Sequence, residues 1–229
     1  MRDDIWVFHT VIPEVLSDDR TVQKGARAKA LHDAAWGLLA DTLHRADPHR
    51  FPDADVATLP AIERLPHGKP VFADGQGPHF SLSHSGRIAV CAISEAGPVG
   101  IDVQEIGGHK EIDGIVRRFF HPAEQEFLKR VGPAHKDHVF YELFSCKEAF
   151  IKMTGKGLTE DLTGFCIERG KDGCFRYVRM GQAIEPAGYL SCADEKQLPA
   201  LAGCVLAVCS GQSGRVNLLR DPVELPKHP

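Results

Sequence analysis

The sequence predicts an α+β fold in which short strands and a few long helices follow one another along the chain. β-branched and aromatic runs such as residues 5–12 are typical of strands. The Ala- and Leu-rich stretch 22–46 contains no proline and repeats its apolar residues at helical spacing. The runs 88–94 and 205–211 share Ala-Val-Cys about half the chain apart, which indicates either coincidence between two buried strands or a duplicated α+β unit.

The other elements are expected in chain order. Residues 47–78 are rich in Pro, Asp and Gly, which is typical of an irregular connection. Apolar periodicity indicates strands and helices in the rest of the chain. These are two strands in 79–94 broken at 83–86, a strand at 99–106, helices at 113–131 and 137–153, and strands within 174–180 and 200–210.

The composition is that of a globular protein with a substantial core. The 229 residues are 43% hydrophobic and 25% charged, which allows one large domain or two small ones. The 27 basic residues against 31 acidic ones give a net charge of −4, which argues against a general nucleic-acid binder. No run is long enough to cross a membrane, and the N-terminus is a poor signal peptide. Seven cysteines without a C-x-x-C pair indicate free thiols in a reducing cytoplasm.

A charged residue interrupts the predicted strand 99–106. Its apolar residues alternate with Gly100, Asp102 and Gln104, so these three share one face. A carboxylate in a buried strand needs a partner, and Gly100 beside it lets another group approach closely. The alternative interpretation is an edge strand with one solvated face.

The predicted helix 137–153 is mostly apolar, so we expect it to be buried. Lys147 falls inside the apolar arc and must either reach water or meet an anion. Glu148 and Lys152 lie on a narrow polar stripe. They form either a helix-stabilising pair, worth ~0.2–0.5 kcal/mol, or the lining of a crevice.

Two short motifs suit phosphate binding, although each alone is a weak signal. The small hydroxyls, imidazole and glycine of SHSG (83–86) stand at a predicted strand end and suit contacts to phosphate oxygens, but serine and glycine also simply make turns. GKP (68–70), before a predicted strand, is weaker still.

Taken in order, these motifs resemble the 4′-phosphopantetheinyl transferase superfamily, in its larger, surfactin-type class. The motifs are GKPVF (68–72), FSLSHSG (80–86), VGIDVQ (99–104), RRFF (117–120) and FSCKEAFIKMTGKGL (144–158). The resemblance implies two similar subdomains related by pseudo-twofold symmetry, with the active site at their interface. We expect the subdomains at residues 1–101 and 102–229, and a monomer.

The resemblance also implies a reaction. Coenzyme A would donate its phosphopantetheine arm to a serine of an apo acyl or peptidyl carrier protein, releasing 3′,5′-ADP, with Mg²⁺ or Mn²⁺ as the ion. Such carriers serve fatty-acid, polyketide or nonribosomal peptide synthesis. Two alternatives remain: a non-catalytic coenzyme A-binding or carrier-docking protein of the same fold, and another metal-dependent phosphate enzyme. The last lacks a Walker-type loop.

Residue by residue, the resemblance implies a site. Asp102, Gln104 and Glu148 are the implied metal ligands, with Gln104 standing where relatives often carry glutamate. Glu148, Lys152 and Glu124 are the implied catalytic residues, either glutamate serving as base. The implied coenzyme A-binding residues are Arg27, Arg64, Lys69, Pro70, Ser83, His84, Lys147 and Lys152. The basic residues expected to face an acidic carrier are Arg117, Arg118, Lys129, Arg130 and Lys136.

Overall fold

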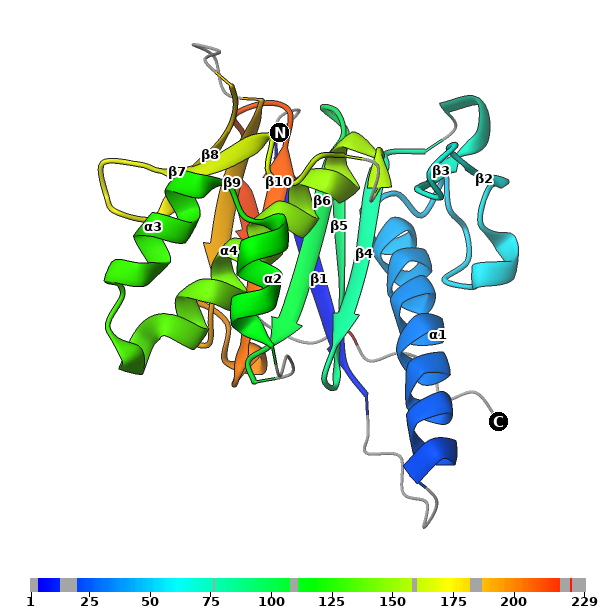
Figure 1. The fold of residues 1–229 in the computed structure, drawn as a ribbon. Coiled ribbons are helices and arrows are strands. Elements are labelled where there is room, and N and C mark those ends of the chain that lie inside the picture. Colours follow the sequence, from blue (N-terminus) through cyan, green and yellow to red (C-terminus); the bar gives the residue numbers. More distant parts are fainter. Residues whose placement is uncertain are drawn as a thin grey trace.

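The structure, a computed structural model, has the α+β fold that the sequence predicts (Figure 1). It describes residues 4–12, 20–75, 77–107, 111–157, 160–181, 187–218 and 223. The helices are α1 (Arg20–Ala46), α2 (Ile112–Phe119), α3 (Pro122–Arg130) and α4 (Pro133–Thr154). The strands are β1 (Ile5–Val11), β2 (Ile62–Arg64), β3 (Pro70–Phe72), β4 (His79–Ser85), β5 (Ile88–Ser94), β6 (Val99–Glu105), β7 (Phe165–Arg169), β8 (Phe175–Met180), β9 (Gly188–Ala193), β10 (Cys204–Ser210) and β11 (Val216–Leu218).

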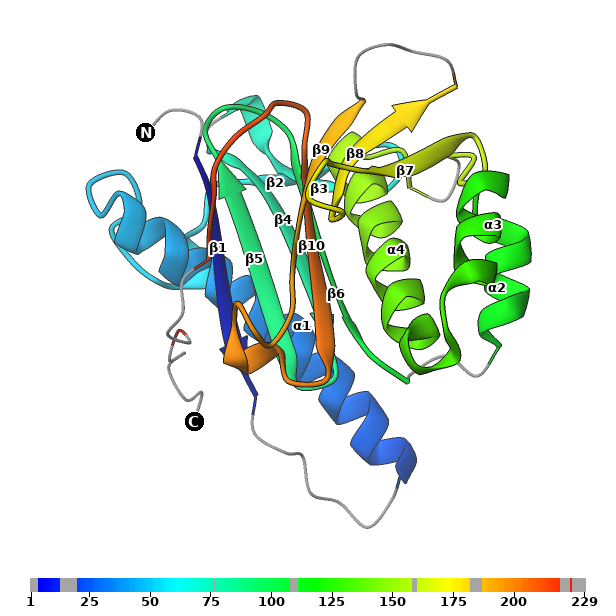
Figure 2. The same ribbon diagram turned by 90° about the vertical axis from the view of Figure 1, so that its left-hand side faces the viewer.

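The N-terminal half forms three strands of a four-stranded sheet, to which β11 adds the fourth, and one long helix covers this sheet. The strand order is β11-β1-β5-β4, with β1 parallel to β11 and antiparallel to β5. Helix α1 crosses the face of this sheet (Figure 2). The apolar face that the Ala/Leu pattern predicted is buried, since Leu38, Leu39 and Leu43 pack with Phe8 and Phe80 in one cluster.

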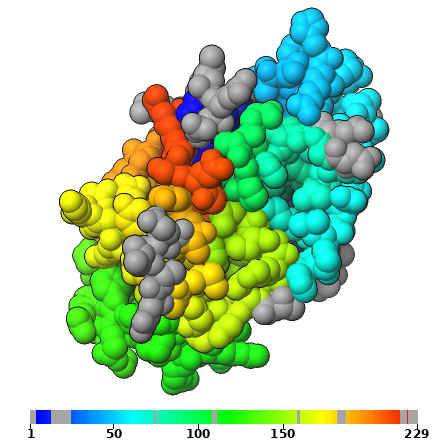
Figure 3. Space-filling view, turned by 90° about the horizontal axis from the view of Figure 1, so that it is seen from above, coloured from blue at the N-terminus to red at the C-terminus, as the bar shows by residue number. Residues whose placement is uncertain are grey.

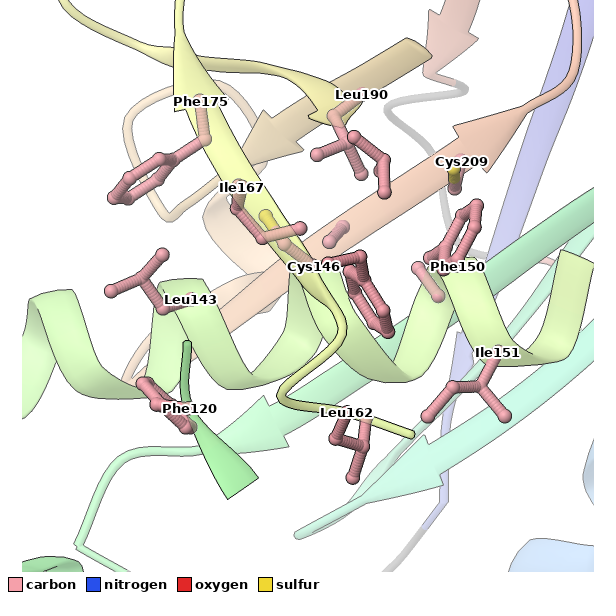
Figure 4. Packing of buried hydrophobic residues seen from close by; sticks show 14 of the residues in the cluster. Phe120, Leu143, Cys146, Phe150, Ile151, Leu162, Ile167, Phe175, Leu190 and Cys209 are labelled. Carbon is pink, nitrogen blue, oxygen red and sulfur yellow. The ribbon is translucent and has the colours of Figure 1, made fainter. Parts of the chain in front are cut away.

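The C-terminal half is a five-stranded antiparallel sheet in the order β6-β10-β9-β8-β7. Its core forms around α4, and Figure 4 shows Cys146 and Phe150 of this helix among side chains of the strands and of the segment before β7. A further cluster joins the halves, because Val7 and Val90 of the first sheet pack with Ile101 of the second. The helix that carries Glu148 and Lys152 is therefore held on one side by a closed apolar core.

The two Ala-Val-Cys runs occupy comparable places. They lie in β5 and β10, every residue of which is buried, and each strand has a neighbour on both sides in its own sheet. The predicted border between residues 101 and 102 falls within β6, which pairs with β10 along its whole length.

The structure corrects the predicted boundaries in three places. The expected helix 113–131 is two helices, because Pro122 begins α3 and His121 caps it in a reciprocal box with Glu124. The expected irregular segment 47–78 contains the β2–β3 hairpin. Strand β4 continues through SHSG as far as Ser85, and the turn follows at Gly86, whose φ is +57°.

All seven cysteines are free, as predicted, and four of them are buried: Cys91, Cys146, Cys204 and Cys209. Among the helices of the described residues, none has the length and hydropathy required to cross a membrane.

Gly100 allows α4 to lie directly on β6. A Cβ atom built at this position would stand 1.9 Å from the carbonyl oxygen of Ala149 and 2.5 Å from the backbone nitrogen of Met153. Both distances are far below van der Waals contact, and both atoms belong to the helix backbone, which cannot move aside cheaply. The sequence-based expectation that Gly100 permits a close approach is thus confirmed.

We predict that Gly100→Ala destabilises the protein by about 1–3 kcal/mol or more, because the added methyl group forces α4 away from β6. Urea denaturation measures the change. Gly97→Ala is the matched control, since the nearest atom to a Cβ there is Gln212 Nε2 at 3.8 Å. Equal stabilities of the two variants would contradict this account of the packing.

Candidate active site between the two sheets

A pocket of about 310 Å³ opens where the two halves meet. It is lined from the first half by α1, the β2–β3 hairpin and β4, and from the second half by β6 and α4. Its lining residues are His32, Ala35, Trp36, Arg64, Pro70, Leu82, Ser83, His84, Asp102 and Lys152. Figure 3 shows the cyan surface of the hairpin segment beside the yellow-green end of α4.

Asp102 is the charged centre of this pocket and is only 2% exposed. Its Oδ1 accepts hydrogen bonds from Ser83 Oγ at 3.0 Å and from Lys152 Nζ at 2.8 Å. Its Oδ2 accepts one from Gln104 Nε2 at 2.9 Å. The sequence predicted that a carboxylate in this strand needs a partner, and the structure provides Lys152, fifty residues away on α4. The pocket side of α4 is thereby fixed to β6.

Glu148 lies one helical turn before Lys152, and its environment disfavours its charge. Burial raises the pKa of Glu148, the negative charge of Asp102 raises it further, and Lys152 partly offsets both effects. Two carboxylates therefore compete for one ammonium group. The crevice interpretation of the polar stripe fits this arrangement better than an isolated helix-surface pair does.

The residues present fit a hard divalent cation with few protein ligands. Among the described residues, no group of three or more His, Cys, Asp or Glu side chains is arranged to hold a metal. The site offers two neighbouring carboxylates, Asp102 and Glu148, whose repulsion a cation would relieve. Gln104 directs its NH₂ group at Asp102. Such a set suits Mg²⁺, which usually takes only one or two carboxylates and completes its shell with water and phosphate oxygens.

Of the residues implied to bind coenzyme A, four line the pocket together with Lys152: Arg64, Pro70, Ser83 and His84. His84 lies near other cationic groups. Burial lowers its pKa, and Lys152 and His32 lower it further. An anion bound here would offset the repulsion among these cationic groups. Arg64 donates from Nη1 to the carbonyl of Gly68 at 2.9 Å, across the hairpin.

Lys69 stands beside the pocket and connects the halves. Its Nζ donates to the carbonyl oxygen of Met153 at 2.8 Å and to that of Val99 at 3.2 Å. Burial lowers the pKa of Lys69 to about 8. Its methylene carbons also lie against Gly155, the left-handed C-cap of α4. In this structure Lys69 therefore joins the hairpin to β6 and α4.

Six implied site residues are not among those that line the pocket: Arg27, Lys69, Gln104, Glu124, Lys147 and Glu148. Arg27 is exposed on α1 and donates from Nε to the carbonyl of Gly86 at 2.9 Å. Lys147 and Glu124 form an ion pair of 2.9 Å in the C-terminal core, with side chains 2% exposed each. Lys147 thus meets an anion, as the sequence required, but that anion is a protein carboxylate. A coenzyme A contact for Lys147 and a base role for Glu124 stay predictions that this geometry does not favour.

The Glu124–Lys147 pair is fully satisfied. Glu124 accepts from the backbone N–H groups of His121 and Ile167, each at 2.8 Å. Lys147 donates to the carbonyls of Leu162 and Phe165 at 2.7 and 3.1 Å. Burial raises the pKa of Glu124 and lowers that of Lys147, while their mutual attraction opposes both changes. The pair connects α3, α4 and the segment that enters β7.

Sequence reasoning missed the pocket residues His32, Ala35, Trp36 and Leu82. His32 and Trp36 are four residues apart on α1, so they share one helix face, and their ring centroids are 6.3 Å apart. That spacing was visible in the sequence, but nothing in it showed which face of α1 would border the site.

Comparison with known proteins finds similarity over part of the chain. The family model described as the 4′-phosphopantetheinyl transferase superfamily matches residues 98–202, which include Asp102, Glu148 and Lys152. A solved structure, holo-[acyl-carrier-protein] synthase of Thermotoga maritima, matches with a TM-score of 0.38 and 18% identity, covering 49% of this chain and 61% of that one.

Curated relatives carry the same description. The 4′-phosphopantetheinyl transferase psf-1 of Bacillus pumilus is 38% identical over 64% of this chain and 61% of its own length. Sfp of Bacillus subtilis is 36% identical over 62% of this chain and 61% of its own length. HetI of a Nostoc species is 34% identical over 57% of this chain and 65% of its own. The matches to these relatives thus span less than two thirds of their length.

The chain is thus similar over part of its length to 4′-phosphopantetheinyl transferases, the proteins that the order of its motifs resembles. Sfp and psf-1 are both among the proteins to which this chain is similar.

We predict that Glu124→Gln lowers the free energy of unfolding by about 3–5 kcal/mol, because it leaves the Lys147 ammonium uncompensated in the core. The double variant Glu124→Gln/Lys147→Met should regain much of that loss in urea denaturation. Glu126→Gln, on the exposed side of the same helix, is the matched control and should change stability little. A stable Glu124→Gln protein with lost activity would instead favour the catalytic role.

The lowered pKa of Lys69 predicts a pH dependence of stability. Between about pH 8 and the ordinary lysine value of 10.5, the unfolded chain binds more protons at this position than the folded chain. The contribution of Lys69 to the free energy of unfolding therefore rises with pH across that window. Urea denaturation of wild type and Lys69→Met at pH 8, 9 and 10 should show a stability difference that moves in favour of wild type. Parallel pH profiles would disprove the burial of this ammonium.

Proposed function

We propose that the protein transfers the 4′-phosphopantetheine arm of coenzyme A to a serine of an apo acyl or peptidyl carrier protein, releasing 3′,5′-ADP in an Mg²⁺-dependent reaction. The observation that carries this proposal is that Asp102 of β6 and Lys152 of α4 meet beside Ser83 and His84 of β4 in one pocket, with Glu148 near enough for both charges to act on it. The relatives named as 4′-phosphopantetheinyl transferases support the same activity.

In this reaction the carrier's serine oxygen bonds to the phosphorus on the pantetheine side of the diphosphate. The bond from that phosphorus to the bridging oxygen breaks, and the bridging oxygen leaves with 3′,5′-ADP. Lys152, whose side chain is 29% exposed, offsets charge on the leaving phosphate. The imidazole of His84 provides a second nitrogen to contact that phosphate. Glu148 accepts the serine proton, directly or through water, since burial and the charge of Asp102 raise its pKa and make it a better base. Mg²⁺ held by Asp102 and Glu148 supplies further charge neutralisation when bound.

We also propose the two-subdomain arrangement, with the active site at the interface of residues 1–101 and 102–229. In its support, each half has one long helix packed on its own sheet, and the repeated Ala-Val-Cys lies in β5 and β10. The pocket takes its lining from both halves. The free cysteines support a cytoplasmic location.

For the carrier, we propose recognition through the ends of α2 and α3. Arg117 and Arg118 are exposed in the last turn of α2, and Lys129 and Arg130 in the last turn of α3. Lys129 is paired with Glu126, so the arginines carry most of the unshared charge of this group. An acidic partner surface complements such a local patch even though the chain is net negative.

The test of the proposal is a direct transfer assay. The protein is incubated with coenzyme A, Mg²⁺ and an apo carrier, and the carrier is weighed by mass spectrometry. A gain of the phosphopantetheine mass, lost when a chelator removes the metal, is the expected result. An unchanged carrier despite coenzyme A binding would identify a non-catalytic binding protein. Nucleotide product without carrier labelling would identify a different phosphate enzyme.

We predict that Glu148→Gln and Lys152→Ala each lower turnover by roughly a hundredfold or more, and that Glu148→Gln does so with a far smaller effect on stability. Glu148→Gln removes a charge and keeps the shape of the side chain, whereas Lys152→Ala also leaves Asp102 without its cation and should lower stability as well. Glu168→Gln, which breaks an ion pair with Arg179 across β7 and β8, is the control and should leave turnover unchanged. If either site variant chiefly lowered the melting temperature, its role would be structural.

A further inference from the structure

The two sheets are joined by serine side chains where a continuous sheet would have backbone hydrogen bonds. β4 and β6 are edge strands of different sheets, yet serine hydroxyl groups of β4 accept hydrogen bonds from backbone N–H groups of β6. The three bonds are Ile101 N to Ser81 Oγ at 3.1 Å, Val103 N to Ser83 Oγ at 3.3 Å and Glu105 N to Ser85 Oγ at 2.9 Å. We call Ser81, Ser83 and Ser85 the serine seam.

The seam has a single register. Each bond joins residues twenty apart, and both numbers rise together, so β4 and β6 run parallel. Every second residue of a strand points to the same side, which is why alternate residues of β4 supply the hydroxyls. The intervening residues of β6, among them Gly100 and Asp102, lie opposite β10 residues in the antiparallel ladder. The seam therefore satisfies the buried N–H groups of Ile101 and Val103, which the edge of a separate sheet would leave unpaired, and also the exposed one of Glu105.

The middle member of the seam is already used to its capacity. A serine hydroxyl has one donor and two acceptor positions. Ser83 Oγ donates to Asp102 Oδ1 and accepts from Val103 N and from Lys152 Nζ, at 2.9 Å for the last. A phosphate oxygen that takes the hydrogen of Ser83 displaces the bond to Asp102. During such an exchange, the register of β6 depends on the outer members of the seam.

We propose that Ser81 and Ser85 are positioning residues. They act through the N–H groups of Ile101 and Glu105 to hold β6 in register with β4, and so hold Asp102 opposite Ser83 and Lys152. Lys69 fixes the start of the same strand through the carbonyl of Val99. For turnover, this inference rests on the proposed transferase function, whereas its structural part is measurable without it.

The first experiment measures amide hydrogen exchange in the full chain, with Ser81→Ala and Ser85→Ala compared with wild type. Ser81→Ala should speed exchange at Ile101 and, through loss of register, at Val103 beside Asp102. Ser94→Ala is the matched control, because Ser94 is equally buried and its Oγ accepts the N–H of Ala96 at 3.3 Å, outside the seam. It should leave both amides unchanged. Unchanged exchange at Val103 in Ser81→Ala would overturn the proposal.

The second experiment measures transfer kinetics. We expect Ser81→Ala and Ser85→Ala each to lower kcat by about tenfold, because small displacements of a reacting geometry cost large factors in rate. The KM for the carrier should stay within about twofold. Ser85→Thr, which keeps a hydroxyl at the half-buried end of the seam, should recover kcat, and Ser94→Ala should match wild type in both constants.

The outcomes separate the two proposals. Faster exchange at Val103 together with wild-type kcat in Ser81→Ala would overturn the positioning role. If Ser94→Ala lowered kcat as much as Ser81→Ala does, the effect would be general destabilisation and the role would again fail. If wild type itself labels no carrier, the proposed function fails, and exchange at Val103 alone then decides whether the seam positions Asp102.

Discussion

A buried carboxylate that needs a cation from another part of the chain governs this structure. Asp102 is almost completely removed from water, and its charge is tolerable only because Lys152 and the hydroxyl of Ser83 meet it. Lys152 comes from α4 and Ser83 from the other sheet, so satisfying one charge fixes three elements relative to one another. The pocket exists at the point where that requirement brings the two halves together.

Holding the charges in place requires a rigid support, which α4 receives on two sides. Towards β6, the missing side chain of Gly100 lets the helix backbone rest on the strand. Towards the C-terminal core, Lys147 is held by Glu124, so the residue next to Glu148 cannot rotate into the pocket. Buried ion pairs contribute little net stability, but they penalise every alternative arrangement that leaves one partner alone. Here rotation of α4, the helix that carries Glu148 and Lys152, would separate Lys147 from Glu124 and is therefore disfavoured.

Local patterns in the sequence predicted the helices and strands, and predicted which residues need a partner. They did not predict which residue the partner would be. The alternation in residues 99–106 showed that Asp102 needs a partner, and the helical arc showed that Lys147 must meet water or an anion, because both follow from periodicity. The identity of those partners depends on contacts across the fold. Glu124 is therefore the carboxylate that Lys147 meets, although the resemblance suggested a base. The hydroxyls of SHSG accept hydrogen bonds from a strand twenty residues away. Pro122 marks the break between α2 and α3, although the apolar pattern continues on both sides of it.

The electrostatics of the pocket explain why an amide at position 104 is compatible with a site of this kind. Asp102 and Glu148 bring two negative charges against the one positive charge of Lys152. His84 adds little positive charge, because burial and its cationic neighbours lower its pKa. A third carboxylate would increase the repulsion that already raises the pKa of Glu148. Gln104 instead donates to Asp102 and so stabilises its charged form without adding to the negative total. With a divalent cation the local sum changes from negative to positive, which is the sign required to receive a diphosphate.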